Sequence, residues 1–398
     1  KIKTMKSVKI LLIIIILFLL FAGAKVISSK YTTPEKPTDI KGLTFQPERS
    51  EVVAEVMEEP KITHIKTPDE VRGIYVTANS FLHRPFKAIL DNLIETTTIN
   101  TIVVDIKDAP GIIDYDIGFD TPCVKARISN EELRAKIDYY HQKNIYVIAR
   151  IAVMRDACFV KNNPELASIK NNGTPWRDRG GHYWLSPHEL KTAQYIVDIS
   201  KAVYASGFDE IQLDYIRYPS DGQMSLLKYE FSSTINSSST NEQKRRETLK
   251  NFVAYVREGL GDIPLSADLF GLVLPSKDDL GIGQHIDDFI PYTDYISPMI
   301  YPSHFHKNWN NLKNTHTMPY ETIYQSTKMG LDRISKNYGT STAIKVMRPW
   351  LQDFSIFGVV YNAPEVKAQI KALEDLGVKS YILWNASNRY TRDALLSE

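Results

Sequence analysis

The sequence predicts an α/β protein, a (β/α)8 or TIM barrel, because strand and helix patterns alternate from Val71 to the end of the 398-residue chain. Two further observations favour one barrel over two domains. The strand patterns number eight, and polar residues gather where these strands end, which is where such barrels carry their chemistry. An open doubly wound sheet is the structural alternative. Its nucleotide-binding form is disfavoured because no glycine-rich loop follows the first strand.

We expect eight short apolar runs to form the strands: Gly73–Thr77, Thr101–Lys107, Ile145–Ala152, Glu210–Asp214, Leu265–Leu269, Tyr295–Tyr301, Ile344–Trp350 and Tyr381–Asn385. Helical patterns fill gaps between them: Phe86–Glu95, Asn130–Lys143, Pro187–Ser206, Lys244–Leu260 and Pro364–Gly377. Ser186 and Pro187 are expected to begin the third of these helices, and Gly207 to end it. Long loops, 155–186 and 220–242, follow the third and fourth strands and are expected to shape a cleft.

The first 70 residues carry a different pattern from the rest of the chain. Four lysines precede an apolar run from Ile10 to Ala24, which ends in small residues at the spacing of a signal-peptidase site. The run is short for a membrane-spanning helix, so we expect residues 1–24 to be a cleaved secretory signal, with an uncleaved membrane anchor as the alternative. The composition of residues 25–70 predicts a linker. The barrel is therefore expected to occupy residues 71–398, outside the cell or at its surface.

Composition and charge narrow the possible partners. The chain has 48 basic and 47 acidic residues and a net charge of +1, and no basic patch indicates nucleic-acid binding. Its two cysteines, Cys123 and Cys158, are expected in neighbouring loops, and the sequence leaves open whether they pair. Two cysteines without a histidine cluster at ligand spacing do not indicate a structural metal site, and no cofactor is expected.

The fourth strand pattern, within residues 208–219, is the most informative stretch for function. Alternate side chains of a strand share a face, so Glu210, Gln212 and Asp214 point one way and apolar side chains the other. We expect the apolar face to pack on the helices and Asp214 to stand near the C-terminal end of the strand. A surface strand with solvated acids is the alternative.

Asp214 and Asp268 end neighbouring strands and form the candidate catalytic pair. Cleaving a glycosidic bond requires an acid for the leaving oxygen and a carboxylate that acts as nucleophile or as base for water. Asp105, in the second strand, is the alternative partner and is otherwise a substrate ligand. Arg150 or Arg217 would keep Asp214 ionised. Alternatively, Asp214 is a structural acid paired with Arg150.

Other residues near the strand ends suit a sugar-binding cleft, because aromatic rings can stack on sugar rings and charged groups can hold hydroxyls. The predicted substrate-binding residues are Asp105, Lys107, Arg150, Trp184, Arg217, Tyr301, Trp350 and Trp384. Any of these tryptophans could equally pack in the core or a loop. Four loop histidines are left out of the catalytic set because a lone loop histidine is usually solvated: His182, His188, His304 and His306.

Four stretches carry a resemblance to a known family: VRGIYVT at 71–77, DIKD at 105–108, GFDEIQLDYIRYP at 207–219 and SPMIYP at 297–302. Together they resemble the bacterial "putative glycosyl hydrolase" domain family over nearly all of residues 71–398. The block around Asp214 is the most specific of the four. The resemblance implies a (β/α)8 barrel, export, action on a polysaccharide and an essential role for Asp214.

The sequence departs from two other groups of barrel glycosidases that it resembles superficially. When the blocks are aligned at Asp209 and Asp214, Gln212 stands where chitinases have their middle aspartate and Ile216 where they have their catalytic glutamate. The chitinase mechanism is therefore not available to this chain. In the α-amylase superfamily an arginine stands at the position of Gln212, and a glutamate takes the place of Asp268.

The leading hypothesis is a secreted or surface-anchored glycoside hydrolase that cleaves a bacterial cell-wall polysaccharide or an exopolysaccharide. Asp214 would be the nucleophile or base and Asp268 the general acid. The alternative is a non-catalytic barrel that binds glycans at the cell wall, favoured if Asp268 and Asp105 both point away from Asp214. A metal-dependent hydrolase is the third hypothesis, disfavoured because no His-x-His pair ends the first strand. The expected partner is a polysaccharide, with membrane contact only through residues 1–24.

Overall fold

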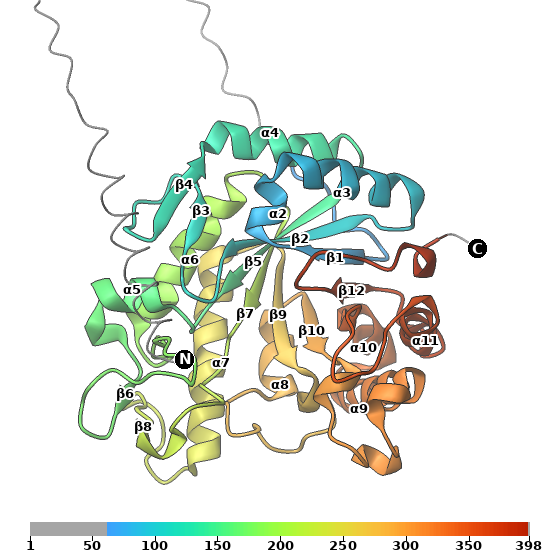
Figure 1. Cartoon of the computed structure of the whole chain (residues 1–398). Coiled ribbons are helices and arrows are strands. Elements are labelled where there is room, and N and C mark those ends of the chain that lie inside the picture. The colour runs from blue at the N-terminus through green and yellow to red at the C-terminus, as the bar shows by residue number, and fades with distance from the viewer. Residues whose placement is uncertain (1–61, 397–398) are drawn as a thin grey trace, which may run out of the picture. The chain divides into compact units, whose positions relative to one another are not determined.

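The computed structural model describes residues 62–396, and its centre is a closed barrel of parallel strands (Figure 1). The barrel strands are β1 (Arg72–Val76), β2 (Thr101–Lys107), β5 (Tyr146–Ala152), β7 (Glu210–Asp214), β9 (Leu265–Phe270), β10 (Tyr295–Met299), β11 (Trp350–Gln352) and β12 (Tyr381–Trp384). Their order around the barrel follows the chain, and β1 closes the sheet by pairing with both β2 and β12. Gly73 lies opposite Thr101 on one side and Ile382 on the other. The predicted (β/α)8 fold is confirmed.

Helices surround the barrel and connect its strands (Figure 1). They are α2 (Ala78–Leu82), α3 (Arg84–Thr96), α4 (Asn130–His141), α5 (Ala157–Asn162), α6 (Leu190–Tyr204), α7 (Asn241–Leu260), α8 (Ile286–Phe289), α9 (Pro319–Tyr338), α10 (Thr340–Val346) and α11 (Ala363–Glu374). The long helices are amphipathic. In α6, for example, Ile196 and Val203 are buried while Gln194 and Lys201 are exposed. Short 3-10 turns complete the connections: η1 (Pro164–Leu166), η2 (Met224–Leu226), η3 (Gly271–Val273), η4 (Ile290–Tyr292), η5 (Pro302–His304), η6 (Trp309–Asn311), η7 (Thr315–Thr317) and η8 (Arg392–Ala394).

The seventh predicted strand is wrong over most of its length. The sequence predicts a strand over Ile344–Trp350, but residues up to Val346 belong to α10 and the strand β11 begins only at Trp350. A short apolar run fits a buried helix and a strand equally well. Here Ala343 and Val346 are buried on one face of the helix, and this burial decides the outcome.

The start of α6 also differs from the prediction. The helix begins at Leu190 with Glu189 at its N-cap, so Ser186 and Pro187 precede it instead of forming its first turn. The Ser186 hydroxyl bonds to a neighbouring histidine ring. Gly207 does follow the end of the helix, with the positive φ of 109° that favours glycine there.

The two long loops predicted after the third and fourth barrel strands are present, and a small sheet joins them. In this sheet β6 (Ile169–Lys170) runs antiparallel to β8 (Leu227–Lys228). A further insertion, which the sequence analysis does not predict, follows β2. There β3 (Ile113–Tyr115) pairs with β2, and β4 (Val124–Ile128) pairs with β3.

Cys123 and Cys158 form a disulfide bond, which resolves the alternative that the sequence leaves open. Their Cα atoms lie 5.8 Å apart, within the usual range for such a bond. Cys123 immediately precedes β4 and Cys158 lies in α5, so the bond ties the insertion after β2 to the long loop after β5.

The interior of the barrel is partly polar, as the alternation in β7 predicts. Ile211 and Leu213 pack in the main apolar core, whereas the Gln212 amide bonds to a serine of β10 inside the barrel. Glu210 is completely buried and forms an ion pair with Arg348. Charged side chains are therefore compatible with this barrel wherever each meets a partner.

Residues 62–70, assigned to the linker by the sequence analysis, pack against the barrel. The Ile65 amide donates to Asp209 Oδ1 at 2.8 Å, and the Thr67 and Tyr146 hydroxyls bond at 2.9 Å. His64 stacks on the Tyr204 ring with centroids 3.8 Å apart. The folded unit therefore begins before residue 71. We call residues 62–70 the N-terminal strap.

The predicted signal and most of the predicted linker, residues 1–61, lie outside the described part of the chain. Between residues 62 and 396, none of the helices combines the length and the apolar character needed to cross a bilayer.

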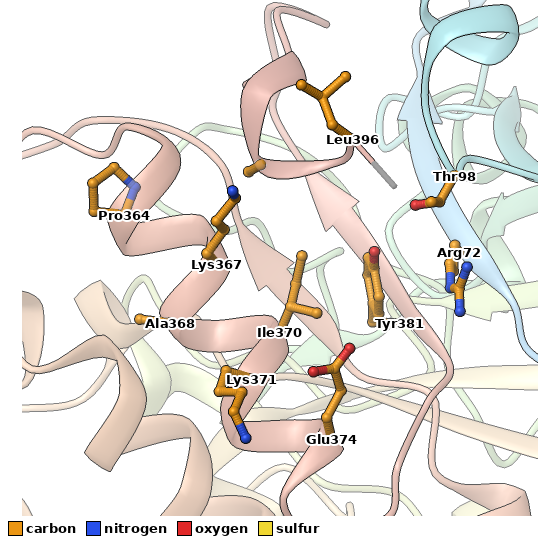
Figure 2. Close-up of a pocket in the computed structure, with 11 residues that line it drawn as sticks. Arg72, Thr98, Pro364, Lys367, Ala368, Ile370, Lys371, Glu374, Tyr381 and Leu396 are labelled. Carbon is orange, nitrogen blue, oxygen red and sulfur yellow. The ribbon is translucent and has the colours of Figure 1, made fainter. Parts of the chain in front are cut away.

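A cavity lies on the outside of the barrel beside α11 (Figure 2). Among the described residues no α-helix follows β12, and the turn η8 lies beside this cavity. The resulting cavity of about 590 Å³ is lined by Lys367, Lys371 and Glu374 of α11 and by Arg72 and Tyr381 at the starts of two strands. None of the predicted site residues lines this cavity.

Candidate active site

Three aspartates from three strands meet one arginine inside the barrel. Arg150 of β5 forms ion pairs through Nη1 with Asp105 of β2 and through Nη2 with Asp214 of β7. Its Nε lies 3.8 Å from Oδ2 of Asp268 on β9. Because Nε and Nη2 share one edge of the planar guanidinium, Asp214 and Asp268 are neighbours on that edge.

The strand register explains why these groups converge. Asp105 lies directly opposite Arg150 in the pairing of β2 with β5, and β7 and β9 are the next two strands around the barrel. Burial opposes the charge on Arg150, yet the pKa of its guanidinium is raised well above the usual value because Asp105, Asp214 and Asp268 surround it. Arg150 is therefore a fixed cation that holds the acidic cluster together.

Asp268 is the most buried of the three acids, with 1% of the residue exposed. The Trp350 indole donates a hydrogen bond to its Oδ1 at 2.6 Å. Burial, together with repulsion from Asp214, raises the pKa of the Asp268 carboxyl well above its ordinary value, and Arg150 offsets only part of this effect. Asp268 therefore keeps its proton at a higher pH than an ordinary aspartic acid.

Asp214 is held from two sides. Arg150 bonds to its Oδ2, and the amide of Tyr215 donates to its Oδ1 at 2.6 Å. Tyr215 has a φ of 52°, in the left-handed region that a tyrosine rarely adopts, and such a conformation costs about 1–3 kcal/mol. The strained turn directs the Tyr215 amide at the carboxylate and fixes its orientation.

Asp105 completes the cluster on the other edge of Arg150. The Tyr75 hydroxyl donates to its Oδ2, and the Tyr75 ring stacks on Trp384 with centroids 4.0 Å apart. Trp350 meets Trp384 edge to face at 5.5 Å. An aromatic wall therefore stands beside the acids.

A cavity of about 270 Å³ opens at this cluster. Its lining residues come from six barrel strands and the loops that follow them: Arg150, Asp214, Tyr215, Arg217, Asp268, Phe270, Met299, Tyr301, His304, Trp350, Phe354 and Trp384. The structure thus brings together most of the predicted site residues, and Asp105 adjoins them through Arg150. The combination of paired acids with an aromatic wall can hold a sugar and protonate its glycosidic oxygen.

Lys107 does not lie at the cavity, and its assignment to substrate binding is wrong. Its ammonium is completely buried, 2.7 Å from Asp156 Oδ2, and also donates to the Ala152 carbonyl. The register of β2 shifts between Asp105 and Lys107, which breaks the alternation of faces that would have placed both in the interior.

Trp184 also lies outside the cavity lining. It is 1% exposed, and its indole donates to Asp178 Oδ2 at 3.2 Å. Trp184 therefore packs in a loop and does not line the sugar-binding cleft that the sequence predicts. The Trp184 ring nevertheless contacts a residue of the cavity, because the Arg217 guanidinium lies over it at 4.9 Å.

Sequence reasoning missed several residues of the cavity. Tyr215, Phe270 and Met299 lie within two residues of a strand end, so listing every strand-end side chain would have found them. His304 lines the cavity from η5, although lone loop histidines are left out of the predicted site. Burial lowers the pKa of His304, which keeps its imidazole neutral near neutral pH.

Fold and site together define a (β/α)8-barrel protein with an arginine-bridged carboxylate pair in an aromatic cavity. The chain belongs to the family described as "Putative glycosyl hydrolase domain", whose model matches residues 73–390. The family resemblance that the sequence motifs predict is confirmed. No curated protein matches the sequence.

Three solved structures are similar to this chain. A hypothetical protein from Ruminiclostridium thermocellum ATCC 27405 is 31% identical, with 49% of this chain and 96% of that chain covered and a TM-score of 0.42. The PgaB (BpsB) glycoside hydrolase domain from Bordetella bronchiseptica is 13% identical over 83% and 99% of the two chains, with a TM-score of 0.60. Alpha-L-fucosidase isoenzyme 2 from Paenibacillus thiaminolyticus is 11% identical over 82% and 47%, with a TM-score of 0.52. The latter two are similar in fold.

Proposed function

We propose that this protein is an exported glycoside hydrolase that cleaves a bacterial cell-wall polysaccharide or an exopolysaccharide. The observation that carries the proposal is the placement of Asp214 and Asp268 on one edge of the Arg150 guanidinium, inside a cavity with aromatic walls. The family to which the chain belongs supports the same class of reaction.

Asp268 is suited to the role of general acid. An acid that protonates the leaving oxygen must keep its proton near the working pH, and burial shifts the pKa of Asp268 in the direction that this role requires. Its Oδ1 accepts from the Trp350 indole, which leaves Oδ2 as the oxygen that would carry the proton. The neutral acid also reduces the charge repulsion with Asp214.

Asp214 is suited to the role of nucleophile or of base for water. It is the more exposed member of the pair, with a side chain 9% exposed against 1% for Asp268. Arg150 and the Tyr215 amide stabilise its charged form through hydrogen bonds. Asp105 and Asp268 both lie within 4 Å of Arg150, the partner of Asp214, and this proximity favours hydrolysis over a barrel that only binds glycans.

Export is supported by the disulfide between Cys123 and Cys158, since stable disulfides persist mainly in oxidising compartments. The basic and apolar pattern of residues 1–24 supports the same location. A hydrolase outside the cell would meet wall and matrix polysaccharides as substrates, and the cavity offers aromatic rings such as Trp384 to bind them.

The test is the release of reducing ends from a panel of bacterial wall polysaccharides and exopolysaccharides by the full chain and its variants. We expect Asp214→Asn and Asp268→Asn to lower kcat by at least about a thousandfold, because each removes a group that acts in the transition state. Asp332→Asn is the matched control, since this aspartate lies exposed on α9 with a side chain 64% accessible.

The variants separate the possible outcomes. Activity that survives in Asp214→Asn would refute the assignment of this residue. Binding of a glycan by all variants without any release of reducing ends would instead identify the protein as a glycan-binding barrel.

A further inference from the structure

Arg217 is a cation at the cavity that has no carboxylate partner within 4 Å among residues 62–396. It follows Asp214 by three residues and lines the same cavity. Both of its hydrogen bonds come from Nη1, to the Tyr218 carbonyl at 3.1 Å and to the Ser220 hydroxyl at 3.1 Å. Arg150 differs, because three aspartates surround its guanidinium.

Three aromatic rings fix the guanidinium of Arg217 in place. Its central carbon lies 4.6 Å from the Phe270 ring centroid, 4.9 Å from that of Trp184 and 5.3 Å from that of Tyr215. These rings stabilise the cation and restrict its movement, but they offer no charged acceptor for its N–H groups. The side chain is thus preorganised, and its hydrogen bonding stays incomplete.

One edge of this guanidinium remains free for a ligand. Nε and Nη2 make no hydrogen bond to the described residues, and neither atom is sealed from solvent. These two nitrogens share an edge and present parallel N–H groups, the geometry that matches the two oxygens of a carboxylate. Because Arg217 lines the cavity, this unbonded edge can meet a bidentate ligand there.

The local charge balance favours an anion at this fork. Burial lowers the pKa of Arg217, and the more distant charge of Asp214 offsets only part of that effect. The other nearby arginine, Arg155, is already paired with Asp178 at 2.9 Å. A bound anion would relieve the cost of the buried charge on Arg217, which a neutral sugar hydroxyl cannot do as well.

We propose that Arg217 selects acidic glycans, by binding the carboxylate of a uronic acid or another carboxylate-bearing sugar next to the cleavage site. This inference rests on the proposed glycoside hydrolase function and narrows its substrate class. It differs from the role in which Arg217 only keeps Asp214 ionised, because that role would not depend on the charge of the substrate.

The experiment compares acidic polysaccharides with their own carboxyl-reduced forms. The probes are polygalacturonate, alginate and hyaluronan, each paired with its reduced counterpart, and binding is followed by tryptophan fluorescence and by calorimetry with the full chain. We expect at least one acidic polymer to bind on the order of tenfold to a hundredfold more tightly than its reduced form, as a charge-assisted bidentate contact implies. Rising salt should weaken this preference.

Variants connect the preference to Arg217. Arg217→Met should bind the acidic polymer and its reduced form equally. Arg217→Lys keeps the charge but loses the fork, so we expect it to retain only part of the preference. Arg177→Met is the matched control, because this arginine is exposed on the loop after β5 and stacks on Tyr183 at 4.2 Å. Thermal unfolding of each variant checks that it folds.

The outcomes distinguish this inference from the function on which it rests. Equal binding of acidic and reduced polymers by the wild type, or no binding of any acidic polymer, would overturn the role of Arg217 even if neutral glycans are cleaved through Asp214. Tight binding of an acidic polymer that requires Arg217, without any cleavage, would support the acidic site and refute the hydrolase.

Discussion

Asp268 shows at the scale of a single residue how the site shapes stability as well as chemistry. Its folded-state pKa lies above the ordinary value of about 3.9 for an unfolded aspartic acid. Between those two values the folded protein binds a proton that the unfolded chain does not. Stability is therefore expected to fall as the pH rises through this window, because the folded state must bury a charge.

We predict that Asp268→Asn keeps or raises the free energy of unfolding above pH 5 while it removes activity. The amide stays neutral at every pH and can still accept from the Trp350 indole through its oxygen. Denaturant unfolding between pH 4 and pH 8 measures the effect, with Asp332→Asn as control. A pH profile of stability identical to that of the wild type would show that Asp268 does not titrate with a raised pKa.

Lys107 illustrates where residue-level prediction stops. The sequence places it two positions after Asp105, so simple alternation puts both on one face. The register shift in β2 and the buried charge of Asp156 redirect the lysine away from the cavity. Neither a bulge nor a partner 49 positions along the chain is visible in the local pattern.

At the scale of elements, the disulfide joins two insertions that carry little apolar core of their own. Residues 124–128 of β4 are half-buried or exposed, and α5 buries only Val160. A bond between Cys123 and Cys158 closes a loop with a sequence separation of 35 residues. The entropy of such a loop corresponds to about 3–4 kcal/mol of stabilisation.

We therefore expect a reducing agent to lower the free energy of unfolding by about 3 kcal/mol and to increase hydrogen exchange in β3, β4 and α5 first. Hydrogen exchange with mass detection, with and without reductant, measures this. The double variant Cys123→Ser/Cys158→Ser is the control and should not respond to reductant. Equal exchange in both conditions would mean that packing alone holds the insertion.

At the scale of the whole molecule, the N-terminal strap packs at the end of the barrel where β5 and β7 begin. Asp209 accepts from the Ile65 amide and from the Val147 amide, each at 2.8 Å, and from the His141 ring at 2.9 Å. Ile65 also packs against the interior cluster that includes Tyr146. The strap therefore donates one of the hydrogen bonds to the carboxylate of Asp209, a residue that is 1% exposed.

We predict that a chain beginning at residue 71 unfolds with a free energy at least about 2 kcal/mol lower than one beginning at residue 62, because a buried carboxylate loses a hydrogen-bond donor. Chemical denaturation of both chains measures the difference, and the full chain serves as reference. Equal stability of the two shorter chains would place the strap outside the cooperative unit.

The sequence by itself determined the barrel and the family, and it named the three aspartates that the structure places around Arg150. Alternating apolar runs and polar residues at strand ends are local patterns, so the sequence alone reveals them. The strand β7 is the clearest case, because the alternation from Glu210 to Asp214 is present in the structure. The helix α9 and the true position of β11 escaped prediction because burial against distant elements decides them.

Only the tertiary structure decided how the acids lie relative to one another. More than 160 positions of the sequence separate Asp105 from Asp268. Closure of the barrel nevertheless brings these two acids and Asp214 to the guanidinium of Arg150. The same closure buries Asp268 and raises its pKa. Burial, orientation and the pairing of charges depend on distances across the barrel, which no local sequence pattern contains.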